Sequence, residues 1–512
     1  MVKPCVITAE GELTGESIRG VLSFKGIPYG EDTGGDNRFE PPIKKRAWQG
    51  ERTAVAYGPD APQFRGPKPK AGATTNNFDL PVSEDCLYLN VWTRDSHPRS
   101  LRPVMVWLHG GGFTSGSASG SMYDGVNLCN RGDIVLVSVN HRLGALGFLH
   151  LAYADESAAD TVNLGMLDIL LALQWVQRNV QSFGGDPDNV TIFGESGGGR
   201  KVTTLLAMPE VKSLFHKAVI QSGSAVLMNT IDGVKRLNET MLGEMDIGDQ
   251  PLASLKRMSV DEILSGQKAA IKKLGERPEG LAQIFAPVAD GSILPGHPFH
   301  PKPPQLSKDI PLMVGYNETE WTLFMGRDPD LLELDQAGLA RRVSRVVGNK
   351  ATDIIEAYRK HFADASESDL LAYILTGYSR YPIDSLVLAE RKSGQKAASV
   401  YLYTMTYRTD AGKGALRTPH ALEIPFVFDN VETSRRFVGS GEGPQAMAEL
   451  MSNSWIAFAT HGDPNHEGLP TWHPFEPETR QTMVFNPDCR CEEDYGKLER
   501  QVWSDYYFPG GL

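Results

Sequence analysis

Short, almost wholly apolar runs alternate with longer amphipathic segments along this chain. Residues 103–108 read PVMVWL and residues 134–139 read IVLVSV, a pattern typical of central strands that are covered on both faces, as in a parallel sheet. Residues 165–183 are instead predicted to form a helix that ends at the sequence GGDP. Its apolar side chains recur at helical spacing: Leu167, Leu170, Leu171, Trp175 and Val176.

The same alternation extends over the rest of the sequence. Further strands are predicted at residues 6–8, 20–24, 87–92, 190–193, 217–221, 311–315 and 399–406, and helical segments at 230–280, 328–395 and 446–461. Because strands and helices alternate, we expect an α/β fold with a mostly parallel sheet. Residues 57–80, rich in Pro, Gly, Lys and Ala, are predicted to form a surface loop near an entrance. No repeat or long linker divides the sequence, so we expect one domain over residues 1–512, with a helical cap or subdomain inserted at roughly 230–395.

The clearest chemical signal lies where a predicted strand turns abruptly into a predicted helix. The turn, GESGG at 194–198, matches the pattern G-x-S-x-G of the α/β-hydrolase nucleophile elbow. Glycines are needed beside the tip of such a turn because a Cβ atom there would collide with neighbouring backbone. The amide groups at the start of the following helix then point toward the reaction centre. The pattern therefore predicts Ser196 as a nucleophile.

A serine hydroxyl needs a base within hydrogen-bond reach, and the base needs an acid that orients it. The histidines after Ser196, where this fold places the base, are His216, His297, His300, His361, His420, His461, His466 and His473. His420 is favoured because it follows the predicted strand at 399–406, and catalytic residues of open α/β sheets collect beyond strand ends. For the acid, spacing alone allows both Glu318 and Glu320, with Asp290 as a weaker third candidate.

An acyl-transfer site also needs amide donors for the oxyanion. The sequence HGGGF at 109–113 follows the predicted strand at 103–108 and matches the glycine-rich loop that supplies them. This loop is expected to form the oxyanion hole together with the amide of Gly197, and one such donor is typically worth ~2.7–4 kcal/mol in the transition state. A phosphate loop is disfavoured, because the Lys and Ser/Thr of a G-x-x-x-x-G-K-[ST] pattern are missing.

The composition of the chain bears on which partners it can bind and on the cellular compartment in which it is expected. The chain carries 51 basic and 63 acidic residues, a net charge of −12, which argues against nucleic-acid binding. Neither a membrane-spanning run nor a signal-peptide core is visible in the sequence. Five scattered cysteines do not form a disulfide framework and favour a reducing, cytoplasmic location. No metal or organic cofactor is expected, because side chains supply both nucleophile and base.

Short segments spread over nearly the whole chain match one known family. Besides the two glycine-rich motifs, they are FKGIPY at 24–29, SEDCLYLN at 83–90, VNHRLG at 139–144, NLGMLD at 163–168, FGGDP at 183–187 and QSG at 221–223. The chain resembles the type-B carboxylesterases, the esterase and lipase group that also contains the cholinesterases. It looks most like bacterial members, including the p-nitrobenzyl esterases.

This resemblance implies an α/β-hydrolase fold with helices on both faces of the sheet, and it assigns roles. By family register the acid is Glu320 rather than Glu318, with Ser196 as nucleophile and His420 as base. By the same resemblance, Gly111, Gly112 and Gly197 would supply the oxyanion donors. The remaining implied residues are Glu195 and Ser222 as supports of the triad, and Arg142 as a buried cation paired with Glu84 or Asp168.

Three departures from the family pattern stand out. Secreted relatives bond the cysteine equivalent to Cys86 to an upstream cysteine, and here the matching position is Ala61, so Cys86 is expected to be a free thiol. The aromatic choline-binding segment is not visible before Ser83, so the chain does not resemble a cholinesterase in that respect. Arg200 stands where a small residue is common, four positions beyond Ser196, either as a cation with a carboxylate partner or as a group that tunes the field near the pocket.

We therefore expect a serine hydrolase that cleaves small carboxylic esters through an acyl-enzyme. Two alternatives are an amide or carbamate hydrolase with the same triad, and a non-catalytic binding protein, which would usually have lost a triad residue. Activity should fall below pH ~6.5, because the base must be a neutral imidazole. Residues 226–228 are placed on the acyl side by position alone, and the oligomeric state, monomer or homodimer, is left open.

Overall fold

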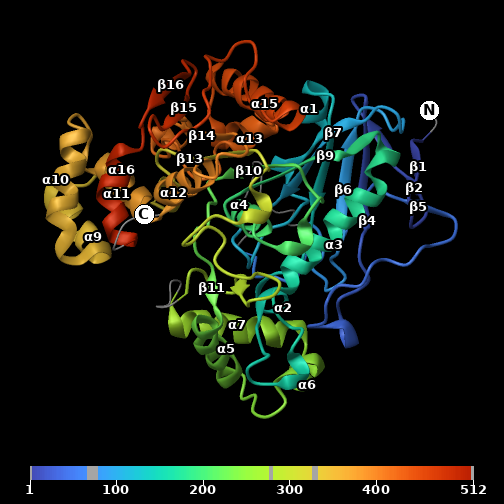
Figure 1. Ribbon diagram of the computed structural model, residues 1–512. Coiled ribbons are helices and arrows are strands. Elements are labelled where there is room, and N and C mark those ends of the chain that lie inside the picture. The colour runs from blue at the N-terminus through green and yellow to red at the C-terminus, as the bar shows by residue number, and fades with distance from the viewer. Residues whose placement is uncertain (1–2, 66–78, 276–280, 326–332, 509–512) are drawn as a thin grey trace. The chain divides into compact units, whose positions relative to one another are not determined.

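A computed structural model describes residues 3–65, 79–275, 281–325 and 333–508 (Figure 1). The chain divides into two compact units. Unit 1 comprises Met1–Val219 and Ala225–Ile310, and unit 2 comprises Ile220–Ser224 and Pro311–Leu512. Residues 66–78, the centre of the predicted surface loop, lie outside the described residues.

Unit 1 is built on a twisted sheet whose strands lie in the order β9-β7-β8-β6-β4-β3. The strands are β3 (Glu16–Ile18), β4 (Val21–Pro28), β6 (Tyr88–Thr93), β7 (Arg102–Leu108), β8 (Val135–Val139) and β9 (Gly185–Glu195). The two apolar runs are β7 and β8, and β7 is parallel to both β8 and β9. The strands on the β6 side pair antiparallel. Helix α3 (Leu164–Asn179) crosses one face of this layer in Figure 1 and ends four residues before the predicted boundary, in a 3-10 turn.

The other elements of unit 1 flank this sheet or extend from it. They are β1 (Cys5–Ile7), β2 (Glu12–Thr14), β5 (Glu51–Thr53), α1 (Val126–Arg131), α2 (Gly144–Phe148), α4 (Gly197–Leu205), β11 (Asn229–Thr230), α5 (Ile231–Glu244), α6 (Pro251–Arg257), α7 (Val260–Leu274) and β12 (Val288–Ala289). Helix α7 begins at a reciprocal cap in which Ser259 and Glu262 bond each other's backbone amides. Strand β10 (Lys217–Gln221) begins in unit 1 and ends in unit 2.

Unit 2 contains three parallel strands, β13 (Leu312–Asn317), β14 (Val400–Met405) and β15 (Gln481–Phe485), with β16 (Arg490–Glu493) antiparallel to β15. Its helices are α8 (Thr322–Met325), α9 (Gln336–Val347), α10 (Ala351–His361), α11 (Glu367–Tyr378), α12 (Tyr381–Ser393), α13 (Ile424–Val427), α14 (Arg435–Val438), α15 (Gly443–His461) and α16 (Lys497–Tyr507). Four aromatic rings pack edge to face in the core beneath β14 and β15: Tyr403, Trp455, Trp472 and Phe485. Helices α9, α10, α11 and α16 gather beside one another (Figure 1).

The helices of the predicted insert are divided between the two units. Helices α5 to α7 belong to unit 1, whereas α9 to α12 belong to unit 2. The arrangement as one domain with a single inserted cap stays a prediction.

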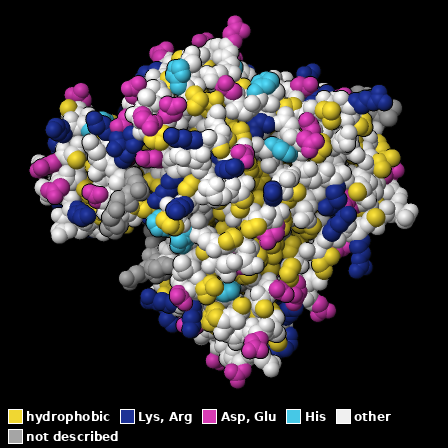
Figure 2. All heavy atoms as spheres, in the orientation of Figure 1, with side chains coloured by type: hydrophobic (Ala, Val, Ile, Leu, Met, Phe, Trp, Pro, Cys, Tyr) yellow, Lys and Arg dark blue, Asp and Glu magenta, His cyan; other side chains and the backbone are white. Residues whose placement is uncertain are grey.

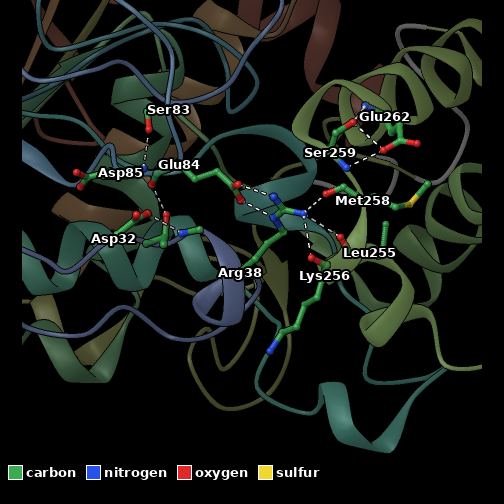
Figure 3. A network of polar contacts seen from close by, with 12 residues as sticks. Asp32, Arg38, Ser83, Glu84, Asp85, Leu255, Lys256, Met258, Ser259 and Glu262 are labelled. Carbon is green, nitrogen blue, oxygen red and sulfur yellow. Dashed lines mark hydrogen bonds and ion pairs between the residues drawn. The ribbon is translucent and has the colours of Figure 1, made fainter.

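Two buried arginines fix loops within unit 1, and each has a different carboxylate. Arg142 forms a bidentate pair with Asp168 on α3, at 2.6 Å between Nη2 and Oδ1, which decides between the two partners expected for it. Glu84 instead binds the guanidinium of Arg38, a pair that sequence reasoning did not identify (Figure 3). The third nitrogen of Arg38 donates to the main-chain carbonyls of Leu255 and Met258, so this side chain ties the chain near residue 38 to the end of α6 (Figure 3).

Removing the partner of the buried arginine is expected to destabilise the fold strongly. Asp168→Ala should lower the free energy of unfolding by ~3–5 kcal/mol, because the guanidinium of Arg142 is left buried without its counter-charge. Urea unfolding followed by circular dichroism measures this loss. Glu239→Ala is the matched control, since the Lys235–Glu239 pair is exposed on both sides and should be worth at most ~1 kcal/mol. Equal losses in the two variants would contradict the assigned role.

The surface agrees with the charge balance of the sequence. Lys and Arg side chains are interspersed with Asp and Glu on the face shown in Figure 2, so no single-sign patch covers that face. None of the helices in the described part of the chain combines the length and the apolar character that a bilayer crossing demands. The five cysteines are free, as expected for Cys86, and the Cys86 thiol is buried.

Candidate active site

Ser196 occupies the tip of the turn between β9 and α4. Its backbone has φ 56° and ψ −119°, a combination that residues other than glycine rarely adopt, so the backbone of the turn is strained at this position. The flanking glycines allow the close approach that the turn needs. A Cβ atom on Gly198 would lie 2.0 Å from the carbonyl oxygen of Leu108, and one on Gly194 would lie 2.6 Å from the same atom. The predicted strand, turn and helix are therefore all present, although β9 begins five residues earlier than expected.

The glycine-rich loop after β7 lies directly against this turn. Gly111 and Gly112 have φ values of +90° and +63°, which explains why glycine occupies both positions. A Cβ atom on Gly197 would lie 2.1 Å from the oxygen and 2.5 Å from the nitrogen of Gly112, so these two backbones are in contact. Ser115 holds the loop, because its amide and its hydroxyl both donate to the Gly111 carbonyl at 3.1 and 3.0 Å. The structure thus brings the predicted donor residues together beside Ser196.

Glu195 and Arg200 flank Ser196 on the same element. Glu195 is buried, and its Oε2 would lie 2.8 Å from a Cβ atom on Gly110, so the carboxylate abuts the start of the glycine loop. Arg200 is half-buried, and its Nη1 donates to the side-chain carbonyl of Gln283 at 2.9 Å. The amide of Gln283 would also meet a Cβ atom on Gly112 at 2.6 Å, so Arg200 reaches the glycine loop through an amide. Its effect on the field near the pocket stays a prediction.

A buried lysine, which the sequence analysis did not single out, lies behind the turn. Lys201 on α4 has none of its surface exposed, and its Nζ donates to the carbonyl oxygen of His109 at 2.8 Å. The stacked rings of His109 and His141 lie nearby, with centroids 5.0 Å apart. The available signal was its position: a lysine directly before the largely apolar residues VTTLLAM at 202–208.

In unit 2, His420 and Glu320 form a buried pair. Nδ1 of His420 lies 2.5 Å from Oε2 of Glu320, and the amide of His420 donates to the Glu320 carbonyl at 3.2 Å. The other carboxylate oxygen of Glu320 accepts from the amide of Asn317 at 2.7 Å. This geometry fixes the orientation of the imidazole and leaves its Nε2 as the atom that can exchange a proton.

The other two acid candidates lie elsewhere. Glu318 accepts a hydrogen bond from the hydroxyl of Tyr495 at 3.1 Å, and burial raises its pKa. Asp290 belongs to unit 1, where its carboxylate accepts from the amides of Ile293 and Leu294. Of the three, the structure brings Glu320 to the imidazole.

A second buried carboxylate adjoins the pair. Glu423 accepts from the side-chain amide of Asn317 at 2.7 Å, and the same amide donates to the Pro419 carbonyl at 2.9 Å. Burial, and then the nearby Glu320 carboxylate, raise the pKa of Glu423 to about 7. Asn317 thus donates to both carboxylates, with its backbone amide to Glu320 and with its side-chain amide to Glu423. The sequence analysis assigned no role to Glu423.

The remaining predicted positions are placed as follows. Ser222 is buried within unit 2, where its amide donates to the Gly315 carbonyl of β13 at 2.8 Å. In unit 1, Val226 and Met228 are buried and Leu227 is half-buried. Aromatic rings flank the imidazole of His420, with Tyr381 at 4.8 Å and Phe324 at 5.8 Å between centroids. These rings give the imidazole an apolar wall.

The family model and the two relatives compared with this chain are named as esterases or hydrolases. The family model described as the carboxylesterase family matches residues 2–503. The para-nitrobenzyl esterase of Bacillus subtilis is 33% identical over 510 residues, covering 98% of this chain and 98% of that protein. The phenmedipham hydrolase of Pseudarthrobacter oxydans is 31% identical and covers 95% of this chain and 96% of its own length.

Solved structures agree with the sequence relatives. The carboxylesterase of Geobacillus stearothermophilus, crystallised at pH 6.2, is similar with a TM-score of 0.82 and 35% identity, covering 98% of this chain and 99% of that one. A solved p-nitrobenzyl esterase has a TM-score of 0.79 and 31% identity over 98% of this chain and 99% of its own.

Proposed function

The chain belongs to the carboxylesterase family and is a carboxylic ester hydrolase, and from that premise we propose that its acyl-enzyme forms on Ser196. The fold is the α/β-hydrolase fold of those relatives, with helices around a mostly parallel sheet. The observation that carries the residue assignment is the turn at Ser196, where the Gly112 backbone lies against Gly197. A serine held at such a tip presents its hydroxyl to a carbonyl carbon while the adjacent amides face the carbonyl oxygen.

The proposed reaction runs in two halves. His420 takes the proton of the Ser196 hydroxyl as the oxygen attacks the ester carbonyl, and it then protonates the departing alcohol. Water attacks the acyl-serine in the second half, with the same imidazole acting as base. The 2.5 Å contact to Glu320 supports the role of that carboxylate, which holds the imidazole orientation and stabilises its protonated form.

The oxyanion of each tetrahedral intermediate is proposed to lie at the amides of Gly111, Gly112 and Gly197. Their support is the positive φ of the first two residues and the backbone contact between the last two. Because the donors are fixed before the substrate arrives, they need not reorient as charge develops on the oxygen. Glu195 and Ser222 are proposed to support the triad, and no step needs a metal ion or an organic cofactor.

The partner of the site is a small-molecule ester. We further propose a cytoplasmic location, supported by the five free cysteines, which fit a reducing compartment. An amide or a carbamate would be cleaved by the same triad, but nothing in this site favours either over an ester.

Hydrolysis of p-nitrophenyl esters with two- to twelve-carbon acyl chains tests the assignment, with p-nitroacetanilide as the amide comparison. We expect turnover of the esters and at least ~10²-fold slower turnover of the anilide, because an amine is the poorer leaving group. A fluorophosphonate should stop the reaction and add one phosphonyl group to the peptide that contains Ser196. Labelling of another residue would overturn the assignment, and faster anilide turnover would favour an amidase.

A further inference from the structure

Lys201 is an unusual residue for its position. It lies on α4, four residues after Gly197, which corresponds to about 6 Å along the helix axis. It is completely buried although lysine is almost never buried without a partner. A buried ammonium group carries a large desolvation cost, so such residues tend to be found where the charge has a use.

The contacts of Lys201 lead to the glycine loop. Its Nζ donates to the carbonyl of His109 at 2.8 Å, and His109 is the residue directly before Gly110, Gly111 and Gly112. The ammonium also lies 5.6 Å from the ring centroid of Phe113, the residue directly after the glycines. The side chain therefore contacts both ends of the loop that supplies two of the three oxyanion amides, while its own helix supplies the third.

The ionisable groups that surround Lys201 are His109, His141, Arg142, Glu195 and Arg200. Burial, and then the neighbouring Lys201 charge, lower the pKa of both His109 and His141, so both rings are neutral. Arg142, which follows His141, is neutralised by Asp168. On β9, the Glu195 carboxylate favours the charged form of Lys201, and on α4 itself Arg200 bonds Gln283.

We propose that Lys201 is a positioning residue for the oxyanion hole, whose protonated ammonium clamps the glycine loop to the nucleophile helix. The charge-assisted hydrogen bond to the His109 carbonyl fixes where the loop starts, and the position of the Gly111 and Gly112 amides follows from that anchor. A neutral amine keeps a weaker bond and removes a positive charge from behind the oxyanion. This inference rests on the proposed function and adds a device that regulates it.

The device responds to pH in the neutral range. Burial lowers the pKa of Lys201 to about 7, with Glu195 opposing the shift. Lys201 is therefore protonated below pH 7 and loses its proton above it. The triad histidine has the opposite requirement, because it must be neutral to act as base. The wild-type rate should therefore increase as the pH is raised through the acid range and decrease again as the pH is raised above about 7.

Lys201→Met and Lys201→Arg test the proposal on p-nitrophenyl butyrate between pH 5.5 and 9. Methionine matches the lysine stem without charge, and arginine stays charged throughout. At pH 6.5 we expect Lys201→Met to lower kcat by about tenfold to a hundredfold while KM changes less than about threefold. At pH 8.5 the wild-type lysine has itself lost its proton, so the ratio of wild-type to variant kcat should shrink to about threefold or less. Lys201→Arg should lose the alkaline decline.

Lys217→Met is the matched control. Lys217 is a second buried lysine of unit 1, burial lowers its pKa too, and its Nζ bonds Asn189 rather than the glycine loop. Its replacement should leave kcat and the pH profile unchanged. A trifluoromethyl ketone, which binds as a tetrahedral oxyanion, should lose affinity for Lys201→Met in the same proportion as kcat falls.

The outcomes separate the two proposals. If the wild-type chain does not hydrolyse the ester, the proposed function fails. If it does, and Lys201→Met matches wild type or loses the same fraction of activity at every pH, the positioning role is overturned. Should Lys201→Met fail to fold by circular dichroism, Lys201→Arg decides, because an alkaline decline identical to wild type would refute the clamp.

Discussion

Ser196→Ala is expected to lower kcat for p-nitrophenyl butyrate by at least ~10⁴-fold, because the acyl-enzyme can no longer form. The remaining rate should still exceed that of water, since the amides of the glycine loop continue to bind the carbonyl oxygen. Stopped-flow measurement of the p-nitrophenol burst reports the effect directly. Wild type should release one equivalent of phenol per chain in the first turnover, and the variant should show no burst.

Ser138→Ala controls for the loss of a buried serine as such. Ser138 lies on β8, and its hydroxyl donates to the Ala118 carbonyl at 3.1 Å, away from the turn that carries Ser196. This variant should keep the burst and change kcat less than about twofold. A burst that survives in Ser196→Ala would show that another residue is acylated.

Glu320→Gln is expected to lower kcat by about 10³- to 10⁴-fold with little change in KM. The carboxylate accepts a hydrogen bond from Nδ1 of His420 at 2.5 Å and keeps that nitrogen protonated, so that Nε2 is the nitrogen that acts as base. An amide side chain can present its NH₂ to Nδ1, and the imidazole then carries its proton on the wrong nitrogen. Steady-state kinetics together with a folding check by circular dichroism measure the effect.

Glu318→Gln provides the matched control two residues away. Glu318 is a half-buried carboxylate that follows the same strand, and it accepts a hydrogen bond from the hydroxyl of Tyr495 instead of from an imidazole. Its replacement should change kcat less than about tenfold. Similar losses in the two variants would mean that general disruption of this loop, and not the orientation of His420, explains the rate.

The elements that sequence patterns predicted well are those whose burial leaves a strong local signature. Strands β7 and β8 are covered on both faces, so their residues are uniformly apolar, and β10 was located at both ends. Strand β15 was not predicted although it is as long as β10, and β16 was not predicted because RCEE is polar and lies at the end of its sheet. The antiparallel pairing of β6 also had no local signal, since pairing direction depends on where the chain returns.

The candidate site divides in the same way. Ser196 and the glycine loop could be predicted because steric demands on the backbone restrict the positions beside the serine, and those of the loop, to glycine. Spacing could not separate Glu318 from Glu320, because two carboxylates two residues apart follow the same strand. What separates them is Asn317, whose backbone amide holds the Glu320 carboxylate, while the chain brings His420 to it from 100 residues away. Lys201 was not predicted because its one signal, a lysine directly before a largely apolar stretch, does not by itself show that the side chain is buried.

Strand β10 sets a limit on how this chain can be dissected. Unit 2 takes Ile220–Ser224 from a region of the chain that is otherwise unit 1, and the Ser222 amide bonds the Gly315 carbonyl there. A recombinant fragment that starts at Pro311 would lack these five residues and would leave that carbonyl without its donor. A fragment that stops at Ile310 would contain residues 220–224 but not β13, the strand of unit 2 to which the Ser222 amide bonds. Complementation of two separately expressed halves, a common route to split reporters, should therefore fail at this junction unless the second fragment also brings its own copy of 220–224.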